Sequence, residues 1–234
     1  MRELVLEIDK LRKSGVGAEV GRRMRELKRN FSSEEKLFSE LCFCILTANE
    51  RAAKGIEIQE KIGNGFAAFS ENELRDFLKR NGYRFYNVRA GYIVEARKHY
   101  GKLKKTLAKL EREGRTGNLM LCVSHNRQSG ALDWKLKTED RMREWLVENV
   151  KGLGWKEASH FLRNAGFNNC AILDRHIIKI MRENRMIREE PKTLNRRRYM
   201  EAEAKLEALC RELGMGQGEL DFYLWYLKTG KVLK

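Results

Sequence analysis

Apolar residues recur at helical spacing along almost the whole chain, and this periodicity constrains the fold more than any other feature of the sequence. No segment alternates apolar and polar residues as a half-buried strand would. Two serine–glutamate pairs with the spacing of a capping box, Ser32–Glu35 and Ser70–Glu73, mark expected helix starts. The first opens an apolar stretch, and the second opens a segment that ends near Gly82. The sequence therefore predicts an all-α protein.

Further helices are expected wherever the apolar period continues. They cover an amphipathic N-terminal segment and residues 86–100, 139–149, 155–165, 174–184, 191–213 and 217–229. Pro191, the only proline, is expected in a first helical turn, where its missing N–H is tolerated. Residues 112–137 are rich in Gly, Asn and Ser and are expected to form a loop.

The charge of the chain indicates what kind of partner it binds. Lys and Arg number 48 against 33 Asp and Glu, which gives a net charge of +15 spread over the whole sequence. Such a surface favours a polyanion, usually nucleic acid, although a solvated surface of ion pairs is the simpler alternative. No apolar run reaches the roughly 20 residues of a membrane span. The five cysteines are scattered and odd in number, which is typical of reduced thiols in a cytoplasmic protein.

A Gly-x-Gly turn at Gly152, Leu153 and Gly154 ends one expected helix and starts the next. The exposed amides of such a turn and of a helix start are suited to hold a phosphate oxygen. Lys156 lies in the first turn of the second helix, where the partial positive charge of the helix start favours a neutral amine. Lys156 is therefore a candidate nucleophile on DNA. The alternative is a lysine that only contacts phosphate.

Asp174 directly precedes a helical run and is placed to be its N-cap. A capping carboxylate is also held ionised, so it can stabilise positive charge that develops nearby, and the two roles can coexist. His176 follows inside the same helix, in a DNA-facing or structural position. The four histidines are isolated from one another and from any cysteine cluster, so no metal site is expected.

The segments Gly152–Ala158 and Ala171–His176 together resemble the helix-hairpin-helix DNA glycosylases, which keep a lysine after the hairpin and an aspartate downstream. Three more segments narrow the resemblance to the compact, largely archaeal 8-oxoguanine DNA glycosylase/AP lyases: Leu46–Asn49, Gly82–Phe85 and Lys231–Lys234. The resemblance extends from about residue 31 to residue 234.

The resemblance implies two helical lobes with a DNA-binding cleft between them. Residues 36–165 would form a helical barrel domain that ends in the helix-hairpin-helix at about 140–165, and residues 1–35 with 166–234 would form the second domain. The partner would be double-stranded DNA that contains 8-oxoguanine. The resemblance further implies a nucleoid-associated monomer without an obligate protein partner.

The resemblance also implies a chemistry of base excision repair. The enzyme would flip the damaged nucleotide out of the duplex, and Lys156 would displace the base, form a Schiff base and permit β-elimination. Asp174 would stabilise the transition state. Trp225 would stack on the flipped purine, and Lys234 would read the lesion through its ammonium or its terminal carboxylate. From the residues alone, Trp225 is equally a core aromatic and Lys234 a solvated chain end.

Four residues are candidates to fill the gap that the flipped base leaves. Asn49 matches the gap-filling asparagine of the family, and it could equally cap a helix end. Tyr83, Arg84 and Phe85 combine aromatic planes with a guanidinium after Gly82. For both aromatic residues, ordinary core packing is the alternative.

No iron–sulfur cluster is expected, because the last fifty residues contain only Cys210. Carbonyls around Val150 and Leu153 are a possible monovalent-cation site, as in similar hairpins. Two other functions compete with 8-oxoguanine excision: an oxidised-pyrimidine glycosylase/lyase of the same superfamily, and a non-catalytic helix-hairpin-helix DNA-binding protein.

Overall fold

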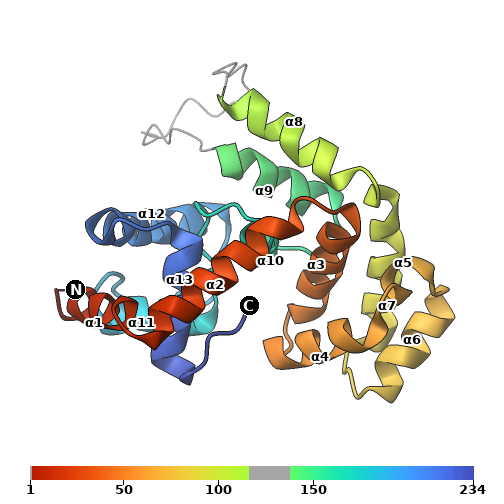
Figure 1. Cartoon of the computed structure of the whole chain (residues 1–234), viewed down its shortest axis with the longest axis horizontal. Coiled ribbons are helices and arrows are strands. Elements are labelled where there is room, and N and C mark those ends of the chain that lie inside the picture. The colour runs from red at the N-terminus through yellow and green to blue at the C-terminus, as the bar shows by residue number, and fades with distance from the viewer. Residues whose placement is uncertain (1, 116–137) are drawn as a thin grey trace.

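The computed structural model describes residues 2–115 and 138–234, and every regular element in these ranges is a helix (Figure 1). The elements, in chain order, are α1 (Arg2–Arg12), α2 (Gly15–Asn30), α3 (Glu34–Thr47), α4 (Ala52–Ile62), α5 (Gly65–Ala68), α6 (Glu71–Arg80), α7 (Tyr86–Ala96), η1 (Arg97–His99), α8 (Leu103–Arg115), α9 (Thr138–Asn149), α10 (Trp155–Asn164), α11 (Arg175–Glu183), α12 (Arg196–Leu213) and α13 (Gln217–Thr229). The all-α class expected from the sequence is confirmed. No helix among the described residues is long and apolar enough to cross a membrane.

Two expectations about helix boundaries were wrong. Pro191 lies outside any helix, because α12 begins at Arg196 with the side chain of Asn195 as its N-cap. An N-cap side chain that accepts the first free amides defines a helix start more strongly than a proline that the first turn merely tolerates. Residues 112–115 belong to α8 rather than to a loop. The rest of the expected loop, residues 116–137, lies outside the described residues.

The capping boxes are confirmed at one of the two positions. Ser70 accepts the Glu73 N–H, and the Glu73 carboxylate accepts the Ser70 N–H in return. At the start of α3 the N-cap is Ser33 instead of Ser32, and its hydroxyl accepts the Lys36 N–H. A lysine at this position has no acceptor to return to the cap, so only half of the motif forms.

The apolar side chains gather in two clusters. The first is built from residues 37–170, and the second joins α1 and α2 to residues 171–232. In Figure 1 the helices of the second cluster, α2 included, lie toward the left, those of the first lie toward the right and top, and the C-terminus lies between the two groups. The division into domains at 35/36 and 165/166 stays a prediction, although the clusters change over close to these positions.

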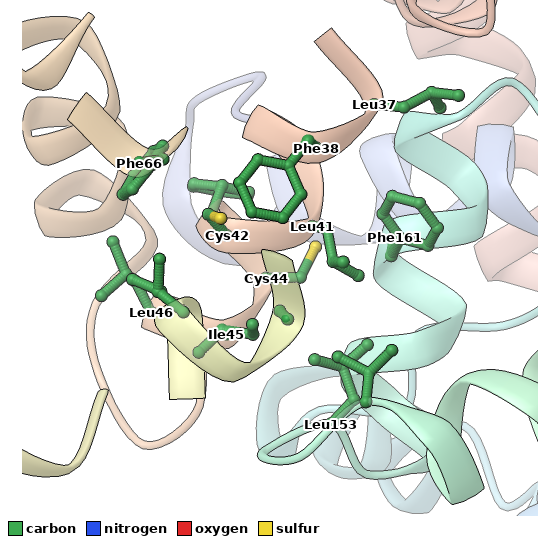
Figure 2. Close-up of a cluster of buried hydrophobic side chains, with 14 of the residues drawn as sticks. Leu37, Phe38, Leu41, Cys42, Cys44, Ile45, Leu46, Phe66, Leu153 and Phe161 are labelled. Atoms are coloured by element: carbon green, nitrogen blue, oxygen red, sulfur yellow. The ribbon is translucent and has the colours of Figure 1, made fainter. Parts of the chain in front are cut away.

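Helix α3 forms the centre of the first cluster. Its residues from Leu37 to Leu46 are buried except for Ser39, because the helix is covered by neighbours on several sides. Figure 2 shows its side chains between Phe161 of α10 and Phe66 of α5. A helix that is apolar all round belongs in the interior. Its C-terminal end therefore emerges from the core at a fixed position, next to the candidate site.

A fully buried arginine connects the two groups of helices. Arg143 on α9 donates two parallel hydrogen bonds to Glu203 on α12, at 2.8 and 2.7 Å, and a further bond to Asp140. The guanidinium also lies over the rings of both Trp155 and Tyr199, at 4.8 and 5.3 Å from their centres. Charges removed from water are tolerated when they are paired and hydrogen-bonded in this way.

We predict that Arg143→Met lowers the free energy of unfolding by about 3–5 kcal/mol, because two carboxylates then stay buried without their cation. Urea unfolding at pH 7 measures the loss. The control is Arg197→Met, which removes an exposed i,i+4 pair with Glu201 and should change stability by less than about 1 kcal/mol. A similar, small change in both variants would contradict this role of the buried cluster.

Candidate active site

The turn between α9 and α10 is as short as the sequence indicated. Its two glycines differ in whether the backbone requires them. Gly152 has a φ of +91°, and a Cβ there would lie 2.4 Å from a ring carbon of Tyr92. Only glycine fits this position. Gly154 has a φ of −96°, which any residue adopts, so the turn does not need the conformational freedom of glycine at this position. Leu153 between them is 6% exposed and packs into the first cluster.

Lys156 is the second residue of α10, and its side chain is 28% exposed. Its Nζ lies 3.1 Å from Oε1 of Glu157. The other oxygen of Glu157 accepts the N–H of Gly154 at 3.2 Å, which fixes the carboxylate at the helix start. The Lys156 amine is therefore held beside the hairpin by the Glu157 carboxylate, which the Gly154 N–H fixes in turn.

Asp174 is the N-cap of α11, as expected from its sequence position. Its Oδ1 accepts the N–H groups of His176 and Ile177, at 2.8 and 2.9 Å. One oxygen makes both capping bonds, so Oδ2 takes no part in the cap. Hydrogen bonds of this kind fix the orientation of the carboxylate. The side chain is thus a fixed anion with one oxygen available to another group.

Lys156, Asp174, Trp225 and Lys234 line one cavity of about 80 Å³. The other lining residues are Thr47, Glu50, Ala52, His160, Arg163, Ile172, Asp221 and Leu233. They come from both groups of helices, and the chain end returns to the gap between them (Figure 1). The structure therefore brings together the four residues that the sequence nominated for catalysis and base recognition.

The ammonium of Lys234 is already paired. Its Nζ lies 2.6 Å from Oε1 of Glu40, a carboxylate that is only 6% exposed, and 4.8 Å from the centre of the Phe43 ring. Glu40 also accepts a bond from the side-chain amide of Asn164, at 2.8 Å. The side chain of Lys234 thus anchors the segment after α13 to α3.

Two lining residues that sequence reasoning missed follow Lys156 along α10. His160 and Arg163 lie four and seven positions after Lys156, which is the spacing of one helix face. Burial lowers the pKa of His160 well below 6.5, and three neighbouring cations add to this shift, so the imidazole is neutral. The helical period of Lys156 is the signal that would have found both residues.

Arg163 pairs with Asp221 of α13 across the floor of the cavity, with 2.6 Å between Nη1 and Oδ2. Burial raises the pKa of the Asp221 carboxyl from 3.8 to about 7, while the Arg163 guanidinium opposes the rise. Asp221 and Trp225 lie one turn apart on α13. Nε1 of Trp225 and Nε2 of His160 are buried without a hydrogen-bond partner among the described residues. These two atoms can bond to a group that enters the cavity.

The candidate gap-filling residues lie outside this cavity, on a neighbouring turn. Asn49 is exposed with a φ of +60°, the left-handed conformation that asparagine adopts after a helix end. Arg84 donates to the Asn49 carbonyl at 2.6 Å and lies over the ring of Phe85, which is half-buried. Tyr83 is 1% exposed, and its hydroxyl donates to the Leu46 carbonyl at 2.7 Å. The wedge role expected of Tyr83 is therefore corrected to core packing.

His176 packs edge to face against Trp225, with 5.1 Å between the ring centres. It therefore supports one wall of the cavity, although it is not among the lining residues. Within residues 2–115 and 138–234, no group of three His, Cys, Asp or Glu side chains is arranged to hold a metal ion.

An amine and a fixed carboxylate that meet in one cavity beside a Gly-x-Gly hairpin place this all-α chain among the helix-hairpin-helix DNA glycosylases. The comparisons with known proteins define the family. A family model described as 8-oxoguanine DNA glycosylase matches residues 20–123 and 122–215. The 8-oxoguanine DNA glycosylase/AP lyase of Korarchaeum cryptofilum is 43% identical over 99% of this chain and 98% of its own length.

Two crystal structures agree with this relationship. The Methanocaldococcus jannaschii 8-oxoguanine glycosylase/lyase, in complex with a 15mer DNA containing 8-oxoguanine, has a TM-score of 0.84 and 42% identity, covering 99% of this chain and 100% of that chain. The 8-oxoguanine DNA glycosylase of Thermotoga maritima has a TM-score of 0.82 and 39% identity, covering 100% and 99%. The chain belongs to the 8-oxoguanine DNA glycosylase family. The family predicted from the sequence is confirmed.

Proposed function

We propose that this protein excises 8-oxoguanine from double-stranded DNA and then cleaves the abasic strand. The names of its relatives support this activity. The single observation that carries it is the cavity in which Lys156 and Asp174 meet Trp225 and Lys234. The first pair suits the chemistry at the sugar, and the second pair suits a flipped purine.

In the proposed reaction the Lys156 amine attacks C1′ as the bond from C1′ to the base breaks, and the base leaves with the bonding electrons. The sugar ring then opens to give a Schiff base. Loss of a proton from C2′ and departure of the 3′ phosphate complete a β-elimination. The fixed carboxylate of Asp174 stabilises the positive charge that develops at C1′. The ammonium must first leave its ion pair with Glu157 and give up a proton, for which the Asp174 carboxylate in the same cavity is the proposed acceptor.

The cavity has to widen to admit a purine. Its volume of about 80 Å³ is far below the roughly 300 Å³ at which ligand pockets begin. Leu233 and Lys234 are the lining residues at the chain end, beyond the last helix, so their movement breaks the fewest backbone hydrogen bonds. Opening at the chain end would expose Trp225 as a stacking plane.

The pairing of Lys234 with Glu40 supports the terminal carboxylate as the group that reads the lesion. 8-Oxoguanine carries a proton on N7 that guanine lacks, and a carboxylate accepts a hydrogen bond from it. In this proposal the Lys234 ammonium only anchors the chain end. The neutral His160 supplies a further polar contact to the base.

DNA binding in this proposal uses the net charge of +15, the hairpin amides around Gly152 and the exposed turn at Asn49. Asn49 would fill the gap that the flipped base leaves, and the hydrogen bond from Arg84 to its carbonyl would hold its backbone in position. The protein would act as a monomer in the nucleoid. It would need no iron–sulfur cluster, and a monovalent cation at the carbonyls of Val150 and Leu153 stays part of the proposal.

We predict that Lys156→Gln abolishes the covalent adduct that borohydride traps with a duplex containing 8-oxoguanine. The variant should still bind that duplex within about twofold of the wild type, because the hairpin amides remain. Lys10→Gln, on the exposed face of α1, is the matched control and should trap normally. A duplex with thymine glycol tests the alternative substrate class. Undiminished trapping by Lys156→Gln would rule out the proposed nucleophile.

The charge of Asp174 can be separated from its capping role. Asp174→Asn keeps a competent N-cap but removes the anion, so thermal stability should change little. Single-turnover excision should fall at least about a hundredfold, the loss typical of a removed electrostatic stabiliser. Calorimetry and single-turnover kinetics on one preparation measure both. Excision at the wild-type rate, or a large loss of stability, would exclude the electrostatic role.

Deletion of Lys234 tests how the lesion is read. We expect excision of 8-oxoguanine to fall more than cleavage of a preformed abasic site, which has no base to recognise. Extending the chain by two residues beyond Lys234 should have the same selective effect, because it moves the carboxylate while keeping the ammonium. Equal losses on both substrates would indicate a general binding or folding defect and contradict this reading of the lesion.

A further inference from the structure

Tyr199 is a buried hydroxyl group that the proposed reaction does not use. It lies on α12 and is 1% exposed. Its ring packs against Trp155, with 6.0 Å between the ring centres, and under the Arg143 guanidinium. Burial raises the pKa of this phenol, so the hydroxyl stays protonated at neutral pH. The ring is therefore held by two neighbouring side chains, and its hydroxyl has a fixed position.

The Tyr199 hydroxyl contacts two segments of the chain, residues 171–173 and helix α10. It donates to the Ala171 carbonyl at 2.7 Å and accepts the Leu173 N–H at 3.2 Å. On its other side it lies 3.2 Å from Oγ of Ser159, on α10. Because the Tyr199 hydrogen goes to Ala171, Ser159 is the donor in this contact, and its single hydroxyl hydrogen is shared with the Trp155 carbonyl, 2.9 Å from Oγ. Nη1 of Arg143 donates to the same Oγ at 3.1 Å. One oxygen atom thus joins the segment 171–173 to the first turns of α10.

These two segments position the proposed reacting groups. Leu173 immediately precedes Asp174, the N-cap of α11. Ser159 lies one turn after Lys156 on the same helix. Segment 171–173 has no helical hydrogen bonds of its own, so the Tyr199 hydroxyl and Glu203, which accepts the Ala171 N–H at 2.7 Å, fix its backbone. A shift at either end of this bridge would change the separation of the amine and the carboxylate.

We propose that Tyr199 is a positioning residue whose hydroxyl sets the separation between Lys156 and Asp174. The inference rests on the roles proposed above for these two residues. Tyr199 does not touch the cavity, so it acts only through the segments that it joins. Displacement of a reacting group by about 1 Å is enough to slow an enzyme roughly a hundredfold.

The test is Tyr199→Phe, which removes the hydroxyl and keeps the ring. We expect single-turnover excision of 8-oxoguanine at saturating enzyme to fall at least about tenfold, while affinity for the same duplex stays within about twofold. Rates are measured well below the unfolding midpoint of each variant. Tyr223→Phe is the control, because it removes another buried phenol from the same cluster, and the Tyr223 hydroxyl makes no hydrogen bond to segment 171–173. It should excise at the wild-type rate.

A double-mutant cycle with Ser159→Ala tests whether the two hydroxyls act as one bridge. If they do, the double variant is no slower than the slower single variant. Multiplied losses, or a Tyr199→Phe variant that is less stable but excises normally, would overturn the positioning role. Failure of the proposed chemistry is seen separately, because trapping by Lys156→Gln would then persist whatever Tyr199→Phe does.

Discussion

The buried cation of Arg143 is the interaction on which the arrangement of the two helix groups depends. Its bidentate bond to Glu203 fixes α9 against α12, and Glu203 then holds the backbone of Ala171. Buried ion pairs add little net stability compared with apolar packing, but a mispaired charge in the interior is strongly unfavourable. The cluster therefore excludes other dockings of the two groups, and it places segment 171–173 as a consequence.

The cavity depends on a second buried polar chain, at the C-terminal end of α10. Glu40 bonds to the side-chain amide of Asn164, and the neighbouring Arg163 bonds to Asp221. The chain links α3, α10 and α13, so the charges beneath the cavity are paired although they are buried. The walls then present the groups left without partners, which are the His160 and Trp225 nitrogens. The proposed base recognition uses this difference: the buried charges already have hydrogen-bond partners, whereas the lining nitrogens do not.

The wedge region shows why residue type alone misleads. Tyr83, Arg84 and Phe85 are consecutive and were equally plausible candidates, yet only Arg84 is exposed while Tyr83 is core. The difference is the direction of each side chain after the left-handed turn at Gly82. The Tyr83 side chain points into the core and donates to the Leu46 carbonyl of α3. The exposed position of Asn49 could be predicted better, because asparagine often adopts the left-handed conformation directly after a helix, which depends only on nearby residues.

The sequence by itself determined most helices, the hairpin at Gly152, and the placement of Lys156 and Asp174 at helix starts. All of these depend on residues within a few positions of one another, through the 3.6-residue period and the capping of free amides. Only the tertiary structure decided that Lys234 bonds to Glu40, 194 positions away, and that Tyr199 bridges α10 to segment 171–173. Such bonds are worth most where water is excluded, and which polar groups share a dry interior is set by packing of the whole chain rather than by local pattern.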